Sequence, residues 1–259
     1  MRSRKNVAWK KSYNRSGGTR VTAVKRIQRA ARRRLASSRI KRVMLSQCET
    51  KTSSQRFWAG TNSQPLYHNT TEFGMLNLLA TSQGTDNPQG TTEDSRNRIG
   101  TEIILRGLSI KFMFMTAQSR PNLNIMGFVF SYEAALSAIT DGQFWCGPSG
   151  GGASQNRFLD RPNLNKVKIL KKFYVHNLPN YSTVVPGGQE RNNTLIKSIY
   201  IPMKNRKLRY QVDGTGAGTN VPKFRDIGVA LVAFDTTNSL TSDIVGYATS
   251  QTTLYFKDP

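Results

Sequence analysis

From about residue 43 to the end of the chain, apolar and polar residues alternate with a period of two. Successive side chains of a β-strand point to opposite faces, so this alternation predicts half-buried strands rather than helices. The runs are rich in β-branched and aromatic residues, and glycine, proline, asparagine and aspartate separate them, as is typical of turns. We expect eight strands, at 43–57, 101–117, 124–132, 166–175, 194–201, 206–212, 227–235 and 246–256.

The pattern also assigns faces within the longer strands. The apolar faces are Leu108, Ile110, Phe112 and Phe114 in one strand, Met126, Phe128, Phe130 and Tyr132 in the next, and Val167, Ile169, Phe173 and Val175 in a third. In the second and third strands, polar or basic positions are expected on the opposite face. Short helices are expected at 72–80 and 132–139, within connections. Antiparallel strands with long connections and no βαβ alternation predict an all-β fold, either a double-sheet jelly roll or another sandwich.

Residues 1–42 differ from the rest in composition. They hold sixteen of the 38 Lys and Arg residues and no acid, since the first is Glu49. Of the formal net charge of +23, +16 therefore lies in this segment and +7 in the remaining residues. The segment has too few large apolar residues to form a core. We therefore expect a disordered basic arm over residues 1–42 and a domain over residues 43–259.

The arm is expected to bind nucleic acid, because a block of positive charge gains free energy when it displaces counterions from phosphates. The candidate residues are all of its basic side chains: Arg2, Arg4, Lys5, Lys10, Lys11, Arg15, Arg20, Lys25, Arg26, Arg29, Arg32, Arg33, Arg34, Arg39, Lys41 and Arg42. Trp9 and Tyr13 lie among them and are candidates for stacking on unpaired bases, which favours single strands; incidental exposure explains these two aromatics equally well. The basic clusters are also typical of nuclear-localisation signals. A short helix over 24–35 is expected on phosphate.

Nothing in the residue pattern indicates an enzyme, a cofactor or a metal site. His68 and His176 lack metal-ligand spacing and are expected to be surface or loop histidines. Cys48 and Cys146, in a chain without an apolar signal segment, favour a reduced intracellular origin. No apolar run is long enough for a transmembrane span.

The domain carries two further basic groups. They are Lys166, Lys168, Lys171 and Lys172 in one strand, and Lys204, Arg206, Lys207 and Arg209 near another. Either group is a candidate for a surface that faces nucleic acid. A solvated strand face is the favoured interpretation of both.

Several parts of the chain resemble the capsid proteins of small circular single-stranded DNA viruses that encode their own replication initiator, the group around circoviruses and geminiviruses. These parts are the arginine-rich arm, the run Cys48-Glu49-Thr50-Lys51, the stretch TSQGTDNPQGTTEDSRNRIGTEIILRGLSIKF and the ending TLYFKDP. Within the long stretch, a Gln-Gly pair followed by Arg98-x-Gly100 and a long strand is the most specific feature.

The resemblance implies a single jelly roll of eight strands in two four-stranded sheets. It also implies that about sixty copies close into an icosahedral shell around a single-stranded DNA genome. The protein would then be found in the virion and, during infection, in the host nucleus, with a nuclear import receptor as a possible host partner.

Three other functions fit parts of the sequence. The coat protein of a small RNA or satellite virus would share both the arm and the jelly roll. A ribosomal or chromatin-associated protein would use the arm on RNA or DNA and stay a monomer or small oligomer. An all-β enzyme or lectin would need a concave site with converging polar groups, for which the sequence offers no candidate.

Overall fold

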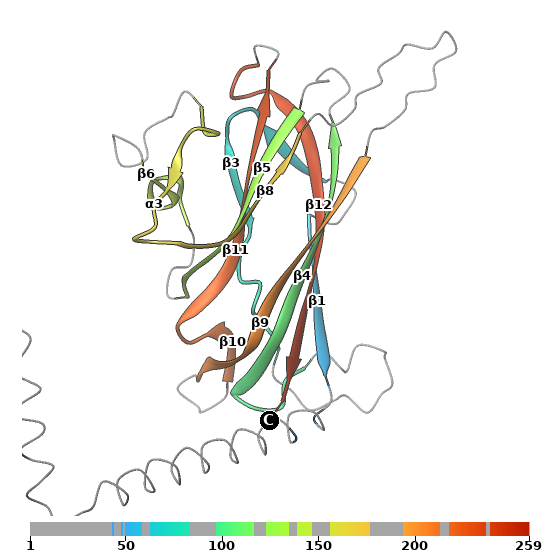
Figure 1. The fold of residues 1–259 in the computed structure, drawn as a ribbon, viewed down its shortest axis with the longest axis vertical. Coiled ribbons are helices and arrows are strands. Elements are labelled where there is room, and N and C mark those ends of the chain that lie inside the picture. The colour runs from blue at the N-terminus through green and yellow to red at the C-terminus, as the bar shows by residue number, and fades with distance from the viewer. Residues whose placement is uncertain are drawn as a thin grey trace, which may run out of the picture. The chain divides into compact units, whose positions relative to one another are not determined.

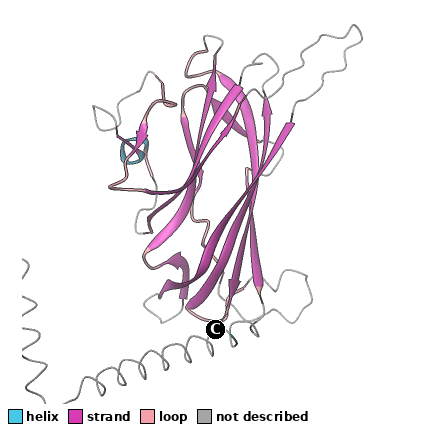
Figure 2. Ribbon diagram, in the orientation of Figure 1, coloured by secondary structure: helices cyan, strands magenta, loops and turns pink. Residues whose placement is uncertain are grey.

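The computed structural model describes Val43, Cys48 and residues 50–58, 63–82, 97–116, 123–134, 139–146, 156–176, 194–212, 218–236 and 239–258. The predicted arm and its helix lie outside the described residues, so the boundary between residues 42 and 43 stays a prediction. The described part is built almost entirely of strands (Figures 1 and 2). None of its helices is long and apolar enough to cross a membrane.

The first sheet contains the longest strands. Its strands are, in spatial order, β1 (Lys51–Phe57), β12 (Ile244–Lys257), β4 (Glu102–Thr116), β9 (Thr194–Val212) and the short β10 (Gly218–Pro222). A further strand, β2 (Gln64–Tyr67), also pairs with β12, at residues 244–248, whereas β1 pairs at residues 250–256. Since β4 occupies the other edge of β12, β1 and β2 follow one another along the same edge as one interrupted strand.

The second sheet has four strands. In spatial order they are β3 (Thr71–Met75), β11 (Arg225–Asp235), β5 (Leu123–Glu133) and β8 (Lys168–Val175). All the pairings between these strands are antiparallel.

The strand pairings within the two sheets are nested along the chain. The first strand, β1, pairs with the last, β12; β3 then pairs with β11, β4 with β9, and β5 with β8. A long antiparallel ribbon that folds over on itself in this way is a jelly roll. The predicted all-β jelly-roll fold is therefore confirmed, with β10 as an extra strand.

The main hydrophobic core lies between the two sheets. Leu108, Ile110, Phe112 and Phe114 of β4 are all buried, as the alternation predicted. Phe112 contacts Phe173 of the opposite sheet, with ring centroids 5.5 Å apart. The core thus joins the middle of both sheets.

A second hydrophobic core covers the outer face of the second sheet. It holds the face of β5 that carries Met126, Phe128, Phe130 and Tyr132, together with Phe144 and Trp145. The covering segment contains α3 (Asp141–Phe144), β6 (Trp145–Cys146) and β7 (Arg161–Pro162). The prediction of a polar opposite face for β5 is wrong, because Ile125 and Val129 on that face are buried in the main core.

The strand β8 also differs from its predicted pattern. Its register with β5 shifts between Val129 and Phe130, which marks a β-bulge. A bulge changes the face on which later side chains lie. Val167 and Ile169 therefore pack in the second core, whereas Phe173 packs in the main core.

Three element predictions are wrong, each because tertiary pairing overrides a local signal. Residues 71–75 of the predicted helix 72–80 form β3, which pairs with β11. The predicted helix 132–139 is wrong at its start, because β5 runs to Glu133, and residues 135–138 lie outside the described residues. The strands predicted at 194–201 and 206–212 are one continuous strand, β9, that pairs with β4 on both sides of a bulge. The helix at Asp141–Phe144 was not predicted, because Asp141-Gly142 is typical of a turn.

Candidate nucleic-acid interface

The arm residues and aromatics predicted to bind nucleic acid, from Arg2 to Arg42, all lie outside the described residues. The structure does show where the chain enters the domain. Lys51, the first residue of β1, pairs with Phe256 near the end of β12. Glu102, the first residue of β4, pairs with Arg209 of β9. The first described strand, β1, therefore starts at the end of the domain where β4 starts and β12 finishes, the lower end in Figure 1.

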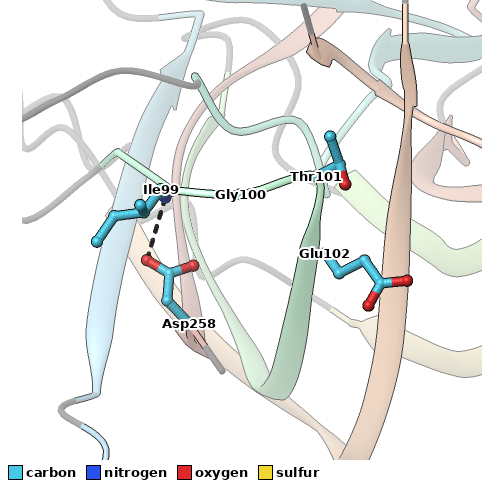
Figure 3. A pocket seen from close by; sticks show the side chains of 5 residues that line it. All are labelled: Ile99, Gly100, Thr101, Glu102 and Asp258. Carbon is cyan, nitrogen blue, oxygen red and sulfur yellow. Dashed lines mark hydrogen bonds between the residues drawn. The ribbon is translucent and has the colours of Figure 1, made fainter. Parts of the chain in front are cut away.

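A pocket lies at this end of the first sheet. Ile99, Gly100, Thr101, Glu102 and Asp258 line it (Figure 3). The Ile99 N–H donates to Asp258 Oδ2 at 3.3 Å. The two carboxylates that line the pocket, of Glu102 and Asp258, are far apart in the sequence but lie at the same end of the first sheet.

Basic side chains of this chain already engage both pocket carboxylates. Lys51 Nζ lies 3.1 Å from Asp258 Oδ2. Lys207 and Arg209 both contact Glu102, with Arg209 Nε 2.6 Å from Oε1. The hydrogen bond from Lys207 lowers the pKa of Glu102. In the described ranges, no group of three or more His, Cys, Asp or Glu residues is arranged to hold a metal ion.

The Arg98-x-Gly100 sequence has a structural role beside this pocket. Arg98 is fully buried, and one of its terminal nitrogens donates to the carbonyl of Gly100. Its guanidinium lies over the ring of Tyr210, 3.9 Å from the centroid. Tyr210 Oη in turn donates to the carbonyl of Leu79 at 2.8 Å and accepts from Thr81 Oγ1 at 2.7 Å. This network ties the segments before and after residues 83–96 to β9.

A bulge lies in β9 close to the same end. The register between β4 and β9 shifts between Leu105 and Gly107. Within the bulge, Lys204 and Asn205 have φ values of 53° and 57°, in the left-handed region that non-glycine residues seldom adopt. Arg106 lies opposite and donates from Nη1 to Asn205 Oδ1 at 3.0 Å. The bulge thus holds two exposed basic side chains, Arg106 and Lys204, on one local surface.

The bulge is the centre of the larger of two basic groups on the domain. Besides Arg106 and Lys204, it has Arg206, Lys207 and Arg209 nearby on β9, and all five are exposed. Strand β9 contains no acid. Glu102 engages only Lys207 and Arg209, so positive charge is in excess here.

The other predicted basic group lies on β8. Lys168, Lys171 and Lys172 are exposed. Lys172 Nζ lies 4.8 Å from the ring centroid of Tyr174, and this ring stacks on His176 with centroids 5.4 Å apart. The lysine and both rings therefore contact one another along the strand. Strand β8 lies at the edge of its sheet. Lysines are common on edge strands, where they discourage pairing with another sheet.

The two histidines lie apart. His176 belongs to the exposed stack on β8. His68 is buried, its Nδ1 accepts from the Asp235 N–H at 3.1 Å, and its ring contacts Phe234. His68 therefore helps to hold the C-terminal end of β11 in place.

Sequence reasoning found four of the basic residues around the bulge but missed Arg106 and Tyr200. Arg106 is a single charge in an otherwise alternating strand, and nothing local distinguishes it. In the sequence, nothing distinguishes Tyr200 from other tyrosines on the solvent-facing side of a strand. Only the pairing of β4 with β9 brings the two residues close together.

Comparisons with known proteins give distant likenesses only. No family model and no curated protein matches the chain. Among solved structures, one of sacbrood virus of honeybee is 12% identical over 82% of this chain and 70% of that chain, with a TM-score of 0.26. The VP1 protein of Trichodysplasia spinulosa-associated polyomavirus, in complex with sialylated glycooligomers, is 8% identical over 80% and 93%, with a TM-score of 0.23.

An aminopeptidase from a marine sediment archaeon, Thaumarchaeota archaeon, reaches the same TM-score of 0.26 at 7% identity. This chain covers 36% of the aminopeptidase, and the alignment covers 80% of this chain. A virus protein and an enzyme are thus equally distant. The jelly-roll assignment therefore rests on the strand pairing described above.

Proposed function

We propose that this protein is the capsid protein of a small virus, and that about sixty copies close into an icosahedral shell around a single-stranded DNA genome. The observation that carries the proposal is the combination of two parts in one chain. Residues 1–42 hold sixteen basic residues and no acid. They lead into a jelly roll at one defined end, marked by Lys51.

The charge of the arm is of the right size for packaging. About sixty arms of +16 supply on the order of a thousand positive charges, comparable to the phosphates of a small genome that condensed counterions already partly neutralise. The division of charge supports separate roles. The arm binds the genome, and the less charged domain, with a net charge of +7, forms the wall.

The domain surface supports self-association. A closed shell needs several different contact surfaces on each subunit. Large apolar side chains are exposed around the described domain: Ile99, Leu159, Leu164, Ile196, Phe224 and Leu240 are each at least 65% exposed. In the assembled shell, neighbouring copies of the chain would cover apolar side chains of this kind. We assign these contacts to other copies of the chain.

The remaining parts of the proposal follow from the capsid role. The protein is not an enzyme and uses no cofactor. Its basic clusters bind a nuclear import receptor, which brings the protein to the host nucleus before it is assembled into virions.

Expression of the full chain tests the proposal. Electron microscopy is expected to show uniform spherical particles, and the same material is expected to sediment as a large assembly. Nuclease-protected nucleic acid recovered from the particles is expected to be single-stranded DNA.

Other results point to the alternatives. Protected RNA would identify the coat protein of an RNA or satellite virus. A monomer or small oligomer at every salt and pH, still able to bind nucleic acid, would identify a ribosomal or chromatin-type protein. Either result contradicts the proposal.

A further inference from the structure

An exposed tyrosine lies directly on a glycine beside the β9 bulge. A Cβ atom built on Gly107 would lie 2.1 Å from Tyr200 Oη and 2.5 Å from Cζ, so a larger residue at position 107 would force this ring to move. Tyr200 is nevertheless 53% exposed. The phenol thus rests with one side against the backbone of β4 while much of its surface stays open to solvent.

Two basic residues lie close to Tyr200 in the pairing of β4 with β9. Arg106 precedes Gly107 in the chain, and its guanidinium is oriented by the bond to Asn205 Oδ1. Lys204 follows in the bulge, in a strained left-handed conformation. Strained residues that the surrounding fold holds in place are frequent at binding sites. The bulge therefore places two basic residues within a few positions of an open aromatic surface.

An aromatic ring with adjacent cations is the chemistry that binds single-stranded nucleic acid. An unpaired base stacks on the ring, and the neighbouring cations bind the phosphates on either side. A duplex offers no free base surface to a tyrosine on a flat sheet.

We propose that Tyr200, resting on Gly107, and the bulge cations Arg106 and Lys204 form a second nucleic-acid contact on the domain. One unpaired base stacks on Tyr200, and Arg106 and Lys204 bind flanking phosphates. The contact lies toward the end of the sheet at which Lys51, the first residue of β1, pairs with β12. This inference rests on the proposed function and adds a defined surface to it.

Binding of a short labelled oligo(dT) strand to the full chain, measured over a range of salt concentrations, tests the contact. Tyr200→Ala is expected to weaken binding by about 5- to 150-fold without changing the salt slope, because stacking carries no charge. Tyr200→Phe is expected to bind like the wild type. Arg106→Gln combined with Lys204→Gln is expected to make the slope of log K against log salt shallower by about 1.4, since two phosphate contacts are lost.

Matched variants on β8 serve as controls. Tyr174→Ala removes another exposed tyrosine, and Lys168→Gln with Lys171→Gln removes the same amount of charge. Both are expected to bind like the wild type. In the unaltered protein, ultraviolet cross-linking followed by mass spectrometry is expected to place an oligo(dT) adduct on Tyr200.

The outcomes separate this contact from the capsid role. If the wild type binds oligo(dT) and forms particles, but the bulge variants bind equally well and every adduct lies within residues 1–42, the contact is disproved and the capsid role stands. Variants that alter particle formation but not binding would show that the surface contacts another subunit, which also overturns the contact. A wild type that neither binds nor assembles disproves the proposed function itself.

Discussion

Asp226 is fully buried at the start of β11, and its carboxylate is only partly satisfied. Oδ1 accepts from the backbone N–H of Leu79 at 3.0 Å and of Ile227 at 2.6 Å. Oδ2 is buried and has no hydrogen-bond partner in the described part of the chain. Burial raises the pKa of Asp226 from 3.8 to about 6, although the two backbone hydrogen bonds oppose this change.

This raised pKa predicts that the protein loses stability as the pH rises. The native state holds the proton of Asp226 more tightly than the unfolded state, so the stabilisation is complete below about pH 4 and is lost as the pH rises through about 6. The free energy of unfolding is expected to fall by up to about 3 kcal/mol across this window. Urea unfolding at a series of pH values measures it.

Asp226→Asn isolates the contribution of this one carboxyl. The amide oxygen can still accept from Leu79 and Ile227, but the side chain no longer titrates. The variant is expected to be more stable than the wild type at pH 7 and to show no such advantage at pH 4. Stability curves that run parallel for the two proteins would contradict this account.

At the scale of the element, the segment that covers the second sheet depends on Trp145. The indole is 1% exposed, and its N–H donates to Thr71 Oγ1 at 2.9 Å. It packs edge-to-face on Phe128 and Phe144, with centroids 5.6 and 4.8 Å apart. Arg157 ties the same segment together through ion pairs of 3.0 Å to Asp141 and Asp160.

Replacing Trp145 is expected to destabilise the domain in two distinguishable steps. Trp145→Ala leaves a large cavity, and the free energy of unfolding is expected to fall by about 3–5 kcal/mol. Trp145→Phe keeps an aromatic ring but loses the hydrogen bond to Thr71, for a smaller fall of about 1–2 kcal/mol. Chemical denaturation measures both. In the same segment, Asn165→Ala is the control; its side chain is exposed, and a change within about 0.5 kcal/mol is expected. Equal effects of all three substitutions would mean that Trp145 does not stabilise the segment that covers the second sheet.

Alternation predicted the long strands because each has one face in the main core. It failed where a strand is buried on both faces, as in β5, and where a bulge changes the face, as in β8. It also divided β9 at Lys204 and Asn205, because a bulge and a turn use the same residue types. These features depend on which strands pair, and that information lies far apart in the sequence.

At the scale of the whole molecule, the arm and the domain differed in how far their sequences could be interpreted. The arm was assigned to nucleic acid from charge alone, since its function needs no particular geometry. The basic group at the bulge was recognised only as a candidate surface, because Arg106 and Tyr200 become neighbours through the pairing of β4 with β9. The composition of a sequence is therefore enough to predict electrostatic binding to nucleic acid. A site for base stacking can be predicted only when the fold is known.

The arm predicts a strong salt dependence for the whole protein. If all sixteen basic residues of residues 1–42 neutralise phosphates of a single strand, the slope of log K against log salt is expected to be about −11.

Deleting residues 1–42 is expected to remove most of this slope and the packaged nucleic acid. The deleted chain is expected to keep its β-sheet circular dichroism, because both hydrophobic cores lie within residues 66–256. An affinity that does not change with salt would contradict binding through the arm, and an unfolded deletion variant would show that the domain begins before residue 43.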